Sequence, residues 1–125
     1  IFSSQEGVLY NKDKTKLLRC PIGKRKCIVE DNTKEIESEA AEYCHNLESV
    51  ILPENLKSIG YASFSGCRKL KKIEIPESVE IIESTAFMDC EDLKEVVLKS
   101  DSTKIEKDVF LRSNPVIERE TYEYK

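Results

Sequence analysis

Apolar residues recur along this chain at a fixed spacing of 23 positions. The clearest copy is residues 70–87, LKKIEIPESVEIIESTAF, which Cys90 follows three positions later. Moving this frame back by 23 residues gives residues 47–64 and Cys67, and moving it forward gives residues 93–110. A repeat of this length is typical of solenoids, in which each repeat buries its apolar side by stacking on its neighbours. The pattern therefore predicts a leucine-rich repeat solenoid of about four short coils.

Each repeat begins with a short run of mostly β-branched residues, which predicts a strand. The runs at 50–52, 73–75 and 96–98 are equivalent, and residues 27–29 precede them in register. Because strand side chains alternate, the first and third residues of each run point to the core and the middle one points outward. One strand per coil predicts a parallel sheet of four strands on one face. The expected inward residues are Val50, Leu52, Ile73, Ile75, Val96 and Leu98.

The second half of each repeat carries an isoleucine, a small residue, an aromatic residue and a cysteine. This segment is too short for a helix of more than a turn or two. We predict a short extended segment followed by a tight helical or 3₁₀ turn. The aromatic position is occupied by Phe64, Phe87 and Phe110, and the cysteine ladder consists of Cys44, Cys67 and Cys90.

The first residues of the chain do not follow the repeat. Two short apolar runs, 7–10 and 16–20, flank the polar segment 11–15, which is rich in turn-forming residues. This arrangement predicts a β-hairpin that covers the open end of the first coil. We expect residues 1–27 to form a capping hairpin segment and residues 28–125 to form the repeats.

The repeat pattern decays near the end of the chain. Counting 23 residues on from Val96 and Leu98 places Arg119 and Thr121 at the inward positions, and Ser113 replaces the cysteine. A charged residue cannot continue a dry core without a partner. The last repeat is therefore expected to be degenerate, either as a polar terminal cap or as the ragged end of a longer array.

The repeat resembles the BspA-like, or Treponema-type, leucine-rich repeat of bacterial and protist surface proteins. The resemblance rests on the pattern LxxIxIPxSVxxIxxxAFxxCxxL, which residues 70–93 match nearly position for position. Residues 7–21 also resemble a non-repeat insert common in that family. The resemblance implies a solenoid with strands on one side and short extended segments on the other. It also implies surface display, adhesion or host contact through a protein partner.

Composition narrows the possible partners and leaves two compartments open. Among 125 residues, 39% are hydrophobic, which suffices for one buried core, and the net charge is only -4. Basic and acidic residues are interleaved, which argues against a nucleic-acid surface. No stretch approaches the roughly 20 apolar residues of a membrane helix, and no secretory signal is visible. The family resemblance favours a cell-surface or secreted protein, and the alternative is a cytoplasmic scaffold with reduced thiols. The partner's identity and the oligomeric state stay open.

The five cysteines allow two interpretations. Neighbouring coils lie about 4.8 Å apart, which is compatible with disulfides within the cysteine ladder. However, three ladder members cannot all pair, which favours buried free thiols that pack as small apolar side chains. Cys20 and Cys27 lie outside the ladder, and a disulfide between them is an alternative. Their spacing does not resemble that of a zinc site.

The sequence favours a domain without enzymatic activity and without a cofactor. Cys44 precedes His45, the single histidine, which suggests a nucleophile with its base. The repeat instead aligns His45 with Arg68 and Glu91 at a solvent-facing position, whereas Cys44 aligns with the core. No glycine-rich phosphate loop, histidine-based metal cluster or carboxylate pair in an apolar setting is present in the sequence.

The outward residues of the strand face are the candidate contacts for a protein partner. One outward file holds three apolar residues, more than solubility requires. One interpretation is a stripe of partner contacts with charged residues on both sides. The other is that these residues make no partner contact, because β-propensity alone selected them or because a flanking segment covers them. The nearby charges equally fit cross-strand ion pairs. The candidate partner-binding residues are Ile28, Ser49, Ile51, Lys72, Glu74, Glu95 and Val97.

Overall fold

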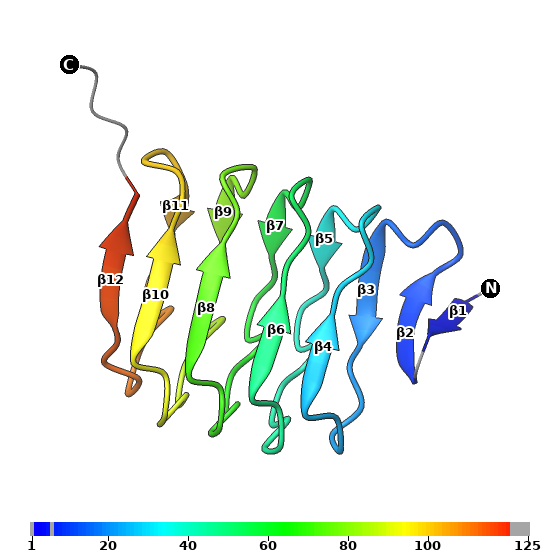
Figure 1. Ribbon diagram of the computed structural model, residues 1–125, viewed down its shortest axis with the longest axis horizontal. Helices are drawn as coiled ribbons and strands as arrows, with labels where there is room; N and C mark the ends of the chain where they lie inside the picture. Colours follow the sequence, from blue (N-terminus) through cyan, green and yellow to red (C-terminus); the bar gives the residue numbers. More distant parts are fainter. Residues whose placement is uncertain (1, 6, 121–125) are drawn as a thin grey trace.

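The computed structural model describes residues 2–5 and 7–120, and it is a solenoid with a parallel strand on one face of each coil (Figure 1). The described residues form strands and turns and contain no helix. The predicted solenoid is confirmed, with five coils in place of about four. The strands are β1 Phe2–Gln5, β2 Val8–Asn11, β3 Lys16–Arg19, β4 Lys26–Ile28, β5 Glu35–Ile36, β6 Ser49–Ile51, β7 Ser58–Ile59, β8 Lys72–Ile75, β9 Ile81–Ile82, β10 Glu95–Leu98, β11 Lys104–Ile105 and β12 Val116–Arg119.

The strand face consists of β4, β6, β8, β10 and β12, which lie parallel in the front of Figure 1. Their register is the predicted one: Cys27 lies opposite Val50, and Ile73 lies opposite Val96. The prediction of one four-stranded sheet is wrong in two respects. β12 adds a fifth strand, and no backbone pairing joins β6 to β8. The face is thus divided into a pair, β4-β6, and a triple, β8-β10-β12, and we call the boundary between β6 and β8 the seam.

Pro76 accounts for part of the seam. Where β8 meets β10, the N–H of Lys99 donates to the carbonyl of Ile75 at 3.2 Å, just beyond the strand ends. The equivalent donor one coil earlier is residue 76, and proline has no N–H. The corresponding bond to the Leu52 carbonyl therefore cannot form.

The opposite face carries a continuous seven-stranded sheet in the order β1-β2-β3-β5-β7-β9-β11. The predicted hairpin is confirmed, since β2 and β3 pair antiparallel across residues 11–15, with an irregularity between Leu9 and Tyr10. β3 then pairs in parallel with β5, so the hairpin covers the edge of the first two-residue strand. It is also tied to the strand face, because the N–H of Glu30 donates to the Tyr10 hydroxyl at 3.1 Å.

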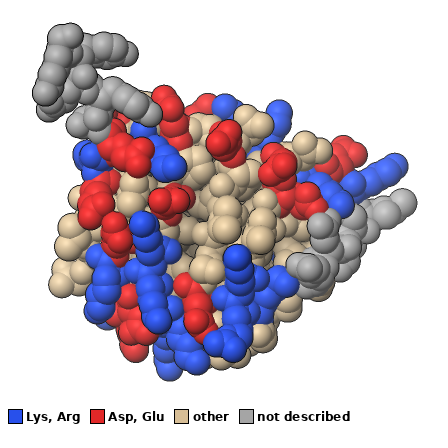
Figure 2. Space-filling model, in the orientation of Figure 1, with Lys and Arg blue, Asp and Glu red and all other residues tan. Residues whose placement is uncertain are grey.

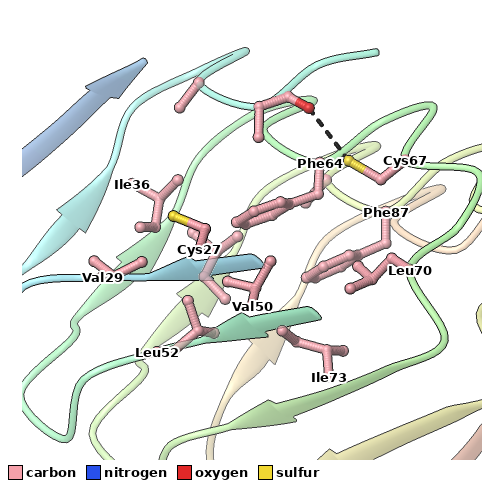
Figure 3. Packing of buried hydrophobic residues seen from close by; sticks show 14 of the residues in the cluster. Cys27, Val29, Ile36, Val50, Leu52, Phe64, Cys67, Leu70, Ile73 and Phe87 are labelled. Carbon is pink, nitrogen blue, oxygen red and sulfur yellow. Dashed lines mark hydrogen bonds between the residues drawn. The ribbon is translucent and has the colours of Figure 1, made fainter. Parts of the chain in front are cut away.

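The core between the two faces is the one that the repeat predicts. All six expected inward strand residues are buried. Phe87 is fully buried, and its ring stacks on Phe64 at a centroid distance of 5.4 Å and on Phe110 at 5.8 Å. Figure 3 shows Phe64 and Phe87 lying parallel beside the strand residues Val50 and Ile73.

The predicted helical or 3₁₀ turn is wrong, because two residues in each repeat adopt left-handed backbone conformations. Several of these residues donate their N–H to the next coil: Ala62 donates to the Ser84 carbonyl at 3.1 Å, and Asp89 donates to the Leu111 carbonyl at 2.9 Å. Successive tight turns therefore replace a helix and link the coils. The left-handed residues at these two repeat positions are Glu39, Tyr43, Ala62, Gly66, Thr85, Asp89, Asp108 and Arg112, and Asn114 is a further one in the last repeat.

The strand of the last repeat differs in register from the prediction. Ile117 lies opposite Val96 and Arg119 lies opposite Leu98, so β12 pairs two residues earlier than the 23-residue frame requires. Ile117 therefore takes the first inward position, and Arg119 takes the second. Every β12 side chain is exposed, because no further coil covers this strand in the described chain. Thr121, the other predicted inward residue, lies outside the described residues.

Candidate binding face

The strand face displays most of the predicted partner-binding residues. Ile28 is 61% exposed and Ile51 is 50% exposed, and they lie opposite each other on β4 and β6. Lys72 and Glu74 are exposed on β8, whereas Ser49 and Glu95 are half-buried. Ile28 and Ile51 therefore form an exposed apolar pair at one end of the face, and Val116 of β12 is exposed at the other end.

Val97 is an exception, because the structure buries this residue to 5% exposure. It was predicted to continue the exposed apolar file. β10 has a paired strand on each side, so Val97 lies between Glu74 of β8 and Glu118 of β12. Ile28 has one paired neighbour, and Ile51 borders the seam, which explains why both stay exposed.

Some of the charges on this face pair with one another. Lys72 Nζ lies 3.9 Å from Glu74 Oε1 and 3.8 Å from Glu95 Oε1, so the predicted cross-strand pair Lys72–Glu95 is present. Glu48 instead pairs with Arg25 at 2.9 Å, and this hydrogen bond lowers the pKa of the Glu48 carboxyl. Exposed pairs are screened by water and cost side-chain entropy, so they order the surface more than they stabilise the fold.

A groove of about 850 Å³ lies over the seam and extends past the carboxyl ends of β8 and β10. Four predicted residues line it: Ser49, Ile51, Lys72 and Glu74. This groove was not predicted, because the apolar repeat runs through the seam without interruption. The lining residues beyond these four are Val50, Leu52, Glu54, Pro76, Glu77, Ser78, Lys99 and Glu120.

Charge on this face is distributed along the strand direction. Figure 2 shows Lys and Arg concentrated in its lower half, where the strands of Figure 1 begin, and acidic side chains mostly in its upper half. Uncharged residues occupy the centre. The basic residues at or before the strand starts include Arg25, Lys26, Arg68, Lys69, Lys71, Lys72 and Lys94.

All five cysteines are free and buried, so the interpretation as buried free thiols is confirmed. Each ladder thiol also donates to a carbonyl of the preceding coil. Cys67 Sγ lies 3.2 Å from the Ala41 oxygen (Figure 3), and Cys90 Sγ lies 3.1 Å from the Phe64 oxygen. Burial raises the pKa of Cys90 to about 12 and that of Cys67 further. The ladder therefore cross-links coils through weak hydrogen bonds, a role that the sequence pattern did not indicate.

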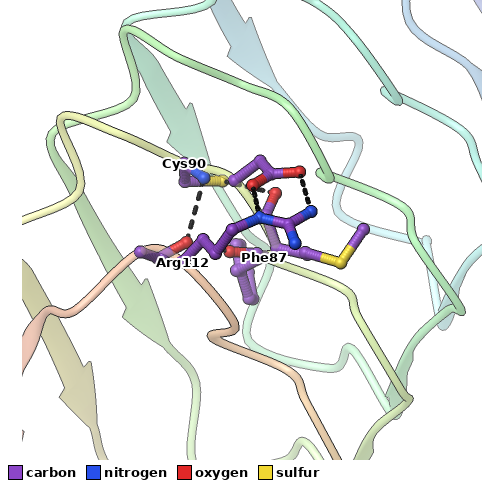
Figure 4. A network of polar contacts seen from close by, with 6 residues as sticks. Phe87, Cys90 and Arg112 are labelled. Carbon is purple, nitrogen blue, oxygen red and sulfur yellow. Dashed lines mark hydrogen bonds and ion pairs between the residues drawn. The ribbon is translucent and has the colours of Figure 1, made fainter.

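Ser113 continues the cysteine ladder into the last repeat. Its hydroxyl donates to the Phe87 carbonyl and accepts a 2.9 Å bond from the Cys90 N–H (Figure 4). Beside it, Arg112 makes two hydrogen bonds with Asp89 and lowers the pKa of that carboxyl. These contacts attach the final turn to the coil before it.

The geometry does not assemble a nucleophile from Cys44 and His45. Cys44 is buried, its thiol donates to the Cys20 carbonyl at 3.5 Å, and a hydrogen bond with Cys20 raises its pKa. His45 is exposed and contacts the Tyr43 ring. A reactive cysteine needs a lowered pKa and access to solvent, the opposite of what Cys44 shows.

The described part of the chain has neither a cluster of metal-binding side chains nor a membrane-spanning helix. Residues 2–5 and 7–120 hold no group of three or more His, Cys, Asp or Glu side chains placed to bind a metal ion. Across the same residues, no helix has the length and apolar character needed to span a membrane.

The fold and the repeat together define a β-solenoid protein of the leucine-rich type. The family model of the BspA type leucine-rich repeat region matches residues 21–121 in six copies. This chain therefore belongs to that family. A search of curated proteins found no match.

Solved structures of bacterial leucine-rich repeat proteins share the fold. A protein from Eubacterium ventriosum is 26% identical with a TM-score of 0.77, covering 89% of this chain and 29% of its own. A cell surface protein from Faecalibacterium prausnitzii is 23% identical with a TM-score of 0.71, covering 97% of this chain and 40% of its own. A protein from Bacteroides capillosus is 20% identical with a TM-score of 0.83, and the match covers 96% of this chain and 99% of that protein. This chain thus spans less than half of the first two proteins.

Proposed function

We propose that this domain is a non-enzymatic binding module whose strand face contacts a protein partner. The observation that carries this proposal is the exposed apolar pair Ile28 and Ile51, which lies on a backbone held in place by hydrogen bonds between coils. Exposed apolar residues grouped on a rigid surface favour protein contact, because burying them on binding releases water from both partners. In this proposal residues 1–27 cap the array, and residues 28–125 supply the binding repeats.

We place the module in a surface or secreted protein that contacts host or matrix proteins. Support comes from family membership and from the similarity to a cell surface protein of Faecalibacterium prausnitzii. The second candidate is an intracellular scaffold, which the five free, buried thiols favour, since reducing compartments keep thiols free. Antibody labelling of the native protein on intact and on permeabilised cells separates the two. Labelling of intact cells supports the surface assignment, and labelling that requires permeabilisation supports the scaffold.

The contact itself is tested with the double variant Ile28→Lys/Ile51→Lys. Both side chains are at least half exposed, so circular dichroism and thermal unfolding are expected to stay unchanged. Binding to a panel of matrix and serum proteins, measured by surface plasmon resonance, is expected to fall at least tenfold for any protein that the native domain binds. Tyr61→Lys is the matched control, because it is 50% exposed and follows β7 on the opposite face. Equal loss in the control, or retained binding in the double variant, contradicts the proposal.

A further inference from the structure

The seam leaves facing peptide groups of the strand face without a strand partner. β6 pairs with β4 on one side and β8 pairs with β10 on the other, but their facing edges are not hydrogen-bonded to each other. Backbone N–H and C=O groups require partners when they are shielded from water. Ser49 and Ile51 of this edge bond to the preceding coil through the Ser49 N–H and the Ile51 carbonyl. Because peptide groups alternate in direction along a parallel strand, those of Val50 and Leu52 face the seam, and both residues line the groove.

The seam also exposes part of the core. Val50 and Leu52 are 7% and 8% exposed, whereas Ile73 and Ile75 of β8 are 1% and 0% exposed. Ile51, which is half exposed, stands beside them on the rim. The floor of the groove is therefore apolar, and its volume of about 850 Å³ is within the range of ligand-binding sites.

The carboxyl-end rim of the groove is acidic. Glu54, Glu77 and Glu120 line it, and no ion pair engages them within residues 7–120. Lys72 also lines the groove, but Glu74 and Glu95 already lie within ion-pair distance of it. Lys99 is the remaining lysine in the lining, so the rim carries excess negative charge and complements a cationic group.

We propose that this groove binds an extended peptide segment that carries apolar side chains and, toward the carboxyl-end rim, a Lys or Arg. The apolar side chains cover Val50 and Ile51, and the cation lies between Glu54 and Glu77. An extended peptide suits the site because the groove follows two strands, and peptide recognition at sheet edges combines backbone bonds with pockets for alternate side chains. This inference rests on the proposed function and names the class of partner.

The test uses a fluorescein-labelled peptide, Ser-Val-Ser-Val-Ser-Arg-Ser-Arg, whose valines and arginines share one face when the peptide is extended, and fluorescence anisotropy at physiological salt concentration. Two control peptides replace either the cationic residues by Glu or the valines by Ser. We expect the cationic, apolar peptide to bind and both controls to bind at least tenfold more weakly. Equal binding of the Ser-substituted peptide would indicate charge attraction alone and would overturn the inference.

Variants of the protein locate the site. Glu54→Lys/Glu77→Lys reverses the rim charge and is expected to weaken binding at least tenfold, and Ile51→Ser is expected to weaken it severalfold. Glu39→Lys/Glu80→Lys applies the same charge change outside the strand face and is expected to have little effect. Equal loss in both charge variants refutes a site at the groove. Absence of peptide binding, with partner binding still lost in Ile28→Lys/Ile51→Lys, overturns this inference and leaves the proposed function standing.

Discussion

Replacing Phe87 by Ala tests the core that the repeat defines. The Phe87 side chain is fully buried, and its ring lies between those of Phe64 and Phe110 at 5.4 and 5.8 Å. Truncating a buried Phe typically costs about 3–5 kcal/mol in the free energy of unfolding, from lost burial and from the cavity left behind. Two ring contacts, each worth about 0.5–1.5 kcal/mol, place Phe87→Ala in the upper part of that range.

Equilibrium unfolding in urea, followed by circular dichroism, measures this loss. With an m-value of about 2 kcal/mol/M, a loss of 4 kcal/mol lowers the midpoint by about 2 M. Phe110→Ala is the matched control, because Phe110 is only partly buried and contacts a single ring in the described chain. We expect it to cost less than half as much. A loss near zero at Phe87, or equal losses at both positions, would refute the assignment of the stack to the core.

Three further predictions concern the backbone and the thiols. Gly60→Ala is expected to cost about 1–3 kcal/mol in urea unfolding, because a Cβ there would lie 2.5 Å from the Ile36 carbonyl oxygen; unchanged stability would contradict this packing. Thr85→Gly is expected to raise the thermal midpoint, because Thr85 is β-branched and adopts a φ of 59°; a lower midpoint would mean that its side-chain contacts outweigh the strain. Burial raises the pKa of Cys90 to about 12 and that of Cys67 further, so their stabilisation is complete below the ordinary thiol pKa and is lost as pH rises above it. Urea unfolding at increasing pH measures this effect. Above about pH 9 the free energy of unfolding is expected to fall by about 1.4 kcal/mol per pH unit for each buried thiol, and to fall less steeply in Cys67→Ser/Cys90→Ser. A free energy of unfolding that does not change with pH would contradict buried thiols.

The side-chain frame of the solenoid was predictable because it depends on local alternation and period. The inward positions of β8 and β10, the stacked Phe residues and the cysteine ladder all follow from the 23-residue spacing. Stacking an apolar residue on its equivalent needs only that each coil repeats the same length. The same alternation along the strands predicted that Ile28 and Ile51 point outward, and both are exposed.

The backbone differs from the predicted 23-residue frame where a residue changes the hydrogen bonding or where a turn is shorter than in the other repeats. The left-handed turns were not predicted, because more than half of these positions carry residues that rarely adopt this conformation, such as Glu39 and Thr85, and Gly66 is the one glycine among them. The β12 register was missed because the turn before it is two residues shorter than the frame. Val97 was predicted to be exposed because alternation gives direction but not the number of paired neighbours.

The seam shows why periodic sequence and periodic pairing are separate properties. Val50 and Ile73 continue the apolar frame across β6 and β8, so the core passes beneath the seam unbroken. The backbone above it does not pair, and Pro76 removes one donor that the next coil provides through Lys99. A repeat array can therefore keep a continuous core while two neighbouring strands of its surface sheet lose their backbone pairing. In this chain the unpaired seam lies beside Ile51 and the acidic rim of the groove. The proposed peptide site therefore depends on a departure from the repeat and not on the repeat itself.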